Sequence, residues 1–190
     1  PWRDLNSELL RQPGLNNKTW LSGVANLSLG GFYEFDSIYN AKKFVTGYFP
    51  AEARKFGVAQ TTRVFAMDVV EEASRQLNSV HFGGIASRTP GAFVYTEVQV
   101  SVPFDQAPWR TMNPILRAQP GLLHKTWLSG VDNQSVGGFY AFDTLENARR
   151  FVTDYFPTET AGLNAAYTTR LFDASATEVA SREMGSQFYR

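Results

Sequence analysis

Two charged residues that could take part in acid–base chemistry lie in stretches that alternate apolar and polar residues. Glu97 belongs to VYTEVQVSV (residues 94–102), and Arg170 belongs to TTRLF. Alternation with a period of two is typical of a half-buried strand. A buried glutamate is a candidate proton acceptor, and an arginine can bind a carboxylate or stabilise an enolate-like oxyanion. The alternative for both is structural, an ion pair that joins an arginine to Glu97 or to a neighbouring helix.

Aromatic residues in two other strand-like segments are candidate walls for a planar ligand. Lys125 and Trp127 in HKTWLS would share one face of a strand. Tyr140 follows Gly137-Gly138, and paired glycines let a ligand or a second strand approach closely. The indole N–H can donate to a substrate, and the phenol can donate or act as an acid. The alternative is that both rings belong to the core and bond internally.

The chain repeats itself. PWRDLNSELLRQPGLNNKTWLSG begins at Pro1, and PWRTMNPILRAQPGLLHKTWLSG begins at Pro108, an offset of 107 residues without a gap. The offset far exceeds the roughly 20–50 residues of solenoid repeats, so each copy should be a domain. The repeat adds three counterparts to the candidate substrate-binding residues, which are therefore Trp127, Tyr140, Lys125, Trp20, Tyr33 and Arg63.

The second copy reads as β-α-β-β-α-β. Strands are expected over about 93–102, 124–129, 135–142 and 166–172, and helices over about 108–118 and 145–155, the latter stopped by Pro157, followed by a short helix near 176–184. This α+β order is that of a ferredoxin-like unit, with both helices on one face of an antiparallel sheet. The uncovered face needs a partner, which the other copy's sheet can supply.

Glycine, serine and proline divide the copies, so we predict a first unit over 1–80, a linker over 81–92 and a second unit over 93–190. Pro1 aligns with Pro108, past the first strand. We therefore expect a strand like VYTEVQVSV upstream of Pro1 in the native gene product. The alternative is that the first copy manages with three strands, which would expose a sheet edge.

Composition excludes several classes of function. Eighteen basic residues balance eighteen acidic ones without a basic stripe, which argues against nucleic-acid binding. No apolar run approaches the roughly 20 residues of a membrane span. There is no cysteine, no opening signal segment and no nucleotide-binding or zinc-protease motif. The two histidines, His81 and His124, show no metal-ligand spacing. We therefore expect a cytoplasmic protein without metal, flavin or haem.

The segment QPGLLHKTWLSGVDNQSVGGFYAFDTLENARRFV resembles the core of the YdhR family. The likeness rests on the PGL stop, the K-T-W strand, the GG-F-Y strand and the A-x-x-F helix, and TTRLFD resembles the closing strand. The resemblance implies the dimeric α/β-barrel fold, here a pseudo-dimer within one chain that can also pair as a homodimer. It also implies monooxygenase activity. The wider superfamily includes cofactor-independent oxygenases of aromatic polyketides, haem-degrading oxygenases, lyases and isomerases.

The resulting hypothesis is a cofactor-independent monooxygenase that acts on a small apolar or aromatic metabolite. Its catalytic residues would be Arg170, Glu97 and Tyr140, in a pocket of the second copy walled by Trp127 and Tyr140. The first alternative is a non-catalytic small-molecule-binding or stress-response module, which would have the same aromatic pocket walls. The second alternative is a lyase or isomerase, which would use the same pocket and the same acid–base groups.

Overall fold

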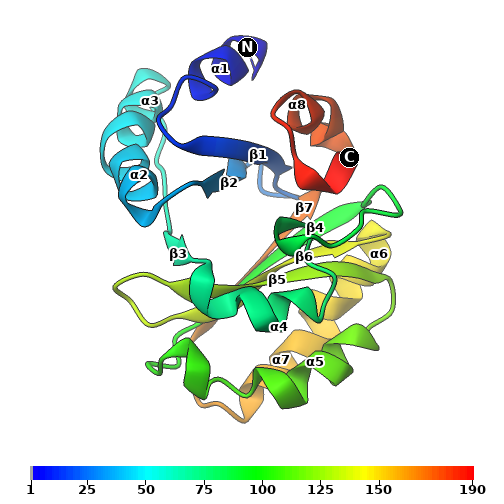
Figure 1. Ribbon diagram of the computed structural model, residues 1–190. Coiled ribbons are helices and arrows are strands. Elements are labelled where there is room, and N and C mark those ends of the chain that lie inside the picture. Colours follow the sequence, from blue (N-terminus) through cyan, green and yellow to red (C-terminus); the bar gives the residue numbers. More distant parts are fainter. Residues whose placement is uncertain (1) are drawn as a thin grey trace.

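The computed structural model describes residues 2–190 and has an α+β fold in which helices surround a curled antiparallel sheet (Figure 1). Five strands form the larger sheet in the order β3-β5-β6-β4-β7, and β1 and β2 form a two-stranded sheet. The strands are β1 Leu15–Ser22, β2 Leu29–Phe35, β3 Phe65–Ala66, β4 Ala92–Val98, β5 Leu122–Gly130, β6 Val136–Phe142 and β7 Tyr167–Asp173. The α-helices are α1 Trp2–Leu9, α2 Ile38–Lys43, α3 Phe49–Lys55, α4 Glu71–Arg75, α5 Trp109–Arg117, α6 Leu145–Arg150, α7 Phe156–Ala161 and α8 Glu178–Glu183.

The second copy contributes four neighbouring antiparallel strands in the order β5-β6-β4-β7. This is the strand order of a β-α-β-β-α-β unit. The first of these strands, β4, ends at Val98 and is shorter than the alternating valines predict. Ser101 takes a left-handed φ of 55°, which breaks the extended backbone before Pro103.

The second long helix of each copy continues past its proline, so the prediction that Pro157 ends it is wrong. A π-helical turn, Phe151–Tyr155, follows α6 and leads directly into α7. Proline lacks an amide hydrogen, and its ring clashes with the carbonyl four residues earlier in a regular α-helix. The wider turn places Pro157 in the first turn of α7, where that amide is not needed. The first copy has the same arrangement: the π-helical turn Phe44–Tyr48 is followed by Pro50 in the first turn of α3.

The two copies exchange their C-terminal segments. Phe65 of β3 pairs with Gly130 of β5, and the Leu77 carbonyl accepts from the Lys125 amide at 3.1 Å. In the reverse direction, the Met184 carbonyl accepts from the Lys18 amide at 3.2 Å. Each copy thus covers an edge of the other's sheet, which removes an edge that would otherwise invite aggregation.

Alternate residues of β4 enter two different cores. Val94 packs with the aromatic residues beneath the helices, whereas Phe93 packs with residues that lie between the two sheets. In this inner core the rings of Phe32 and Phe139, one from each copy, stack in parallel with centroids 4.4 Å apart. No helix within residues 2–190 is both long and apolar enough to cross a membrane.

Candidate active site

The sequence predicts that Trp127, Tyr140 and Glu97 line one pocket, but in the structure they lie on opposite faces of the large sheet. Trp127 and Tyr140 belong to the core beneath the helices, and the Lys125 ammonium lies 2.9 Å from the centroid of the Trp127 ring. Glu97 contacts Tyr95, which packs with the inner core on the opposite face. A single pocket therefore cannot be walled by Trp127 and Tyr140 and also receive the Glu97 carboxylate.

The polar atoms of the aromatic cluster already have internal partners. The Trp127 indole N–H donates to the Asn113 side-chain oxygen at 2.9 Å, and the hydroxyls of Thr96 and Tyr140 lie 3.5 Å apart. In the first copy the Trp20 indole donates to Asn6 at 2.8 Å. The Lys18 ammonium lies 2.8 Å from the Trp20 ring centroid and 4.8 Å from that of Tyr33. The copies share this cluster as part of their packed cores.

Burial lowers the pKa of Lys125 well below its ordinary value, although the charge of Glu159 opposes the shift. Folding near neutral pH therefore costs either desolvation or a lost proton. We expect Lys125→Met to raise the free energy of unfolding by about 1–4 kcal/mol at pH 7. The advantage should shrink towards pH 10, because the unfolded lysine then also loses its proton.

Urea titrations of both proteins at pH 7 and pH 9.5 measure this effect. Lys42→Met is the matched control, since the Lys42 side chain is 48% exposed and forms only a surface ion pair with Asp132. A loss of stability on Lys125→Met at both pH values would show that the ammonium stabilises the fold.

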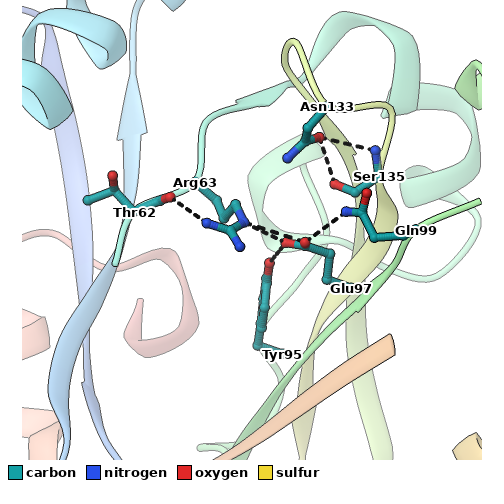
Figure 2. A network of polar contacts seen from close by, with 7 residues as sticks. All are labelled: Thr62, Arg63, Tyr95, Glu97, Gln99, Asn133 and Ser135. Atoms are coloured by element: carbon teal, nitrogen blue, oxygen red, sulfur yellow. Dashed lines mark hydrogen bonds and ion pairs between the residues drawn. The ribbon is translucent and has the colours of Figure 1, made fainter. Parts of the chain in front are cut away.

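Glu97 lies in a polar network on the inner face (Figure 2). Its carboxylate accepts from the Tyr95 hydroxyl, from Arg63 Nε at 3.0 Å and from Gln99 Nε2 at 3.1 Å. Arg63 also donates to the Thr62 carbonyl at 3.0 Å. Burial first, and then Glu97, raise the pKa of Tyr95, so its hydroxyl remains a donor. This network joins the two copies, as the structural alternative for Glu97 predicts.

The remaining predicted catalytic residue, Arg170, lies opposite Tyr95 in the register of β7 and β4. It is exposed and forms no ion pair with any residue between 2 and 190. Asn133, also drawn in Figure 2, accepts from the Ser135 amide at 3.1 Å and stabilises the turn between β5 and β6.

A carboxylate–imidazole dyad, which the sequence does not single out, lies between the two sheets. His81 Nδ1 is 2.9 Å from Glu34 Oε2, and Asn17 Nδ2 donates to the same oxygen at 3.1 Å. The His81 side chain is 1% exposed, and its Nε2 has no hydrogen-bond partner within residues 2–190. Phe32 and Phe188 pack against the imidazole with centroid separations of 5.3 and 5.5 Å.

The surroundings of the dyad favour a charged glutamate. Burial alone would raise the pKa of Glu34, but the hydrogen bond and charge of His81, together with bonds from Asn17 and Asn16, outweigh burial and lower it. In its neutral form His81 can donate Nδ1–H to Glu34, which leaves a lone pair on Nε2. Burial lowers the pKa of nearby His124, whose Nδ1 lies 2.7 Å from the Asn78 carbonyl. The arrangement is suited to a general base at His81.

The dyad occupies positions at which the two copies differ. Glu34 aligns with Ala141, and His81 aligns with Phe188. The two residues are 47 positions apart, and His81 lies at the start of the predicted linker. Because the two histidines lack metal-ligand spacing, the sequence gives them no role as ligands, and their possible acid–base role is missed. Glu34 can be found from the sequence by looking for ionisable residues of one copy whose counterpart in the other copy is not ionisable.

Aromatic side chains fill the space around the dyad. Phe139 and Phe188 are almost fully buried, whereas Phe32 is half-buried and lies nearer to solvent. Within residues 2–190 no group of three or more His, Asp or Glu side chains is arranged to hold a metal ion.

Two solved structures resemble this chain. The structure of an anthrone oxidase-like protein superposes with a TM-score of 0.54 at 11% identity, covering 90% of this chain and 84% of that one. A structure titled "putative monooxygenase", from Lactobacillus acidophilus NCFM, gives a TM-score of 0.47 at 12% identity, with 90% and 83% covered. No protein-family model and no curated protein matches the chain. At such low identity, the first likeness shows a shared α+β fold with a curled antiparallel sheet.

Proposed function

We propose that the protein is a cofactor-independent oxygenase that uses the His81–Glu34 dyad to deprotonate a planar, electron-rich aromatic metabolite. The observation that carries the proposal is the buried His81 Nε2, which has no hydrogen-bond partner within residues 2–190 and lies among aromatic rings. Burying an aromatic ring of the substrate between such walls stabilises the complex by roughly 1.5–3 kcal/mol. The unpartnered base then faces the substrate.

An anthrone illustrates the chemistry. His81 Nε2 accepts a proton from the acidic methylene, and Glu34 stabilises the imidazolium that forms. The carbanion transfers electrons to molecular oxygen and forms a carbon–oxygen bond, and the resulting peroxide anion takes the proton back from His81 Nε2. Loss of water from the peroxide leaves a carbonyl group. The methylene thus loses two hydrogens and gains one oxygen atom, while the second oxygen atom leaves as water.

Two further features support the proposal. The inner faces of the two copies meet around the dyad, an arrangement that matches the dimeric α/β barrel implied by the YdhR-like motifs. The name of the anthrone oxidase-like protein makes an anthrone the first substrate to test. We therefore propose both that the chain is YdhR-like and that its substrate is a planar aromatic metabolite.

Oxygen uptake measured after dialysis against a chelator tests the proposal. We expect uptake equimolar with the quinone formed, at a rate well above that of buffer. Absence of enzyme-dependent uptake with anthrone and with simpler planar phenols would contradict it.

A non-catalytic binding module is the second candidate, because aromatic residues fill the interior in this structure. It predicts saturable ligand binding without oxygen uptake. A lyase or isomerase using the same base predicts turnover that continues when oxygen is removed.

A further inference from the structure

A second buried polar atom beside the dyad has no hydrogen-bond partner. Asn17 is 2% exposed, its Nδ2 donates to Glu34 Oε2 at 3.1 Å, and its Oδ1 has no partner within residues 2–190. His81 Nδ1 contacts the same Glu34 oxygen at 2.9 Å. A charged carboxylate can only accept hydrogen bonds, so the amide nitrogen of Asn17 faces Glu34 and the amide oxygen faces away. Asn17 and His81 thus share one carboxylate oxygen, and each keeps one unpartnered atom.

The second copy shows why the Asn17 oxygen lacks a partner. At the matching position, His124 Nδ1 lies 2.7 Å from the Asn78 carbonyl oxygen and 3.1 Å from Asn78 Nδ2. The counterpart of Asn78 is Gly185, which lies against Asn17 and has no side chain. A methyl group on Gly185 would lie 3.9 Å from Asn17 Cβ, and every other heavy atom outside its chain neighbours would be more than 4 Å away. The glycine therefore leaves both an unpartnered acceptor and room beside it.

One segment lies beside both unpartnered residues. Gly185 lies three residues before Phe188, whose ring packs against the His81 imidazole with centroids 5.5 Å apart. Asn17 and His81 are therefore both covered by residues 185–188. A ligand that reaches the His81 imidazole next to this segment also lies close to the Asn17 oxygen.

The chemistry of the free oxygen determines what it can select. An amide oxygen accepts a hydrogen bond from a hydroxyl or N–H group, and a buried acceptor without a donor is costly. A ligand with a hydroxyl at this place gains the bond, whereas a ligand without one leaves the acceptor unsatisfied. Sites built in this way discriminate against analogues that lack the hydroxyl.

We infer that Asn17 determines substrate specificity by accepting a hydrogen bond from a hydroxyl group of the substrate, next to the carbon that His81 deprotonates. The inference rests on the proposed function, because it concerns the same site. It narrows the substrate class from planar aromatic metabolites to those with a hydroxyl beside the reacting carbon. Anthrone lacks this group, whereas 4-hydroxyanthrone has a hydroxyl next to its methylene.

Ligand titration without oxygen tests the inference, with anthrone and 4-hydroxyanthrone as probes and quenching of tryptophan fluorescence as the signal. We expect the parent chain to bind 4-hydroxyanthrone at least about tenfold more tightly than anthrone. Asn17→Leu removes the acceptor at similar volume and should abolish this preference. Gly185→Asn should abolish it too, because the new amide fills the room and can donate to Asn17. The backbone suits this second change, since Asn78 has a φ of 53° and Gly185 a φ of 68°.

Asn78→Gly is the matched control, because it makes room beside His124 instead of Asn17. It should leave the preference unchanged. The inference is overturned if the parent chain binds the two probes equally or binds neither, or if the preference persists in Gly185→Asn or in a folded Asn17→Leu. Loss of the preference in Asn78→Gly would also overturn it. Oxygen uptake is not measured here, so a preference abolished by the two substitutions supports the inference even if turnover fails. Uptake without a preference contradicts the inference and leaves the proposed function standing.

Discussion

Replacing His81 with glutamine is expected to lower kcat for oxygen-dependent turnover by about 10²–10⁴-fold, the usual contribution of a positioned general base. Glutamine retains a polar side chain but cannot accept and hold the substrate proton. The dissociation constant for the aromatic substrate should change little, because ring packing provides most of the affinity. Steady-state oxygen uptake and ligand titration measure the two quantities separately.

His124→Gln is the matched control for this loss. His124 lies nearby, but its Nδ1 bonds to the Asn78 carbonyl rather than to a carboxylate. Its replacement should therefore leave kcat within a few-fold of the parent. Glu34→Gln should give an intermediate loss, because it removes the charge that stabilises the imidazolium. Full turnover in His81→Gln, or an equal loss in His124→Gln, would contradict the assignment of the base.

Replacing Trp127 with alanine is expected to lower the free energy of unfolding by about 3–5 kcal/mol. Trp127 is 6% exposed, Phe104 packs against its ring, and its indole N–H bonds to Asn113. The substitution leaves a cavity and removes the partner of the buried Asn113 oxygen. Urea denaturation monitored by circular dichroism measures the change.

Trp20→Ala tests the same reasoning in the first copy. Trp20 also bonds to an asparagine, Asn6, but a hollow lies beside its ring where Phe104 lies in the second copy. Less packing is lost, so Trp20→Ala should cost less than Trp127→Ala. If Trp127→Ala costs under about 1 kcal/mol and instead abolishes ligand binding, Trp127 is a pocket wall rather than a core residue.

Local patterns predict the elements of this fold well. The alternation in VYTEVQVSV predicts a strand, and the strand order of the second copy matches its β-α-β-β-α-β pattern. The continuous helix through Pro157 is missed because a π-helical turn has no simple sequence signal. Pattern reading treats such a proline as a stop.

The alternation of apolar and polar residues within one strand does not show which of its side chains lie on the same side of the sheet as those of a neighbouring strand. Glu97 lies opposite Gly137 in β6, whereas Trp127 lies opposite Gly138. Adjacent positions on one strand point to opposite sides of the sheet, so this register places the two side chains on different faces. Neither strand alone contains that information. The pairing of Glu34 with His81 depends in the same way on the exchange of C-terminal segments between the copies.

Deuterium exchange without oxygen tests the central claim, that His81 is the base, most directly. Anthrone is incubated anaerobically in D₂O with the parent chain, with His81→Gln or with buffer alone, and deuterium at the methylene is followed by mass spectrometry. The account predicts exchange above the buffer rate with the parent chain and none above it with His81→Gln. Equal exchange in the parent chain and His81→Gln, or no enzyme-dependent exchange in either, would contradict it.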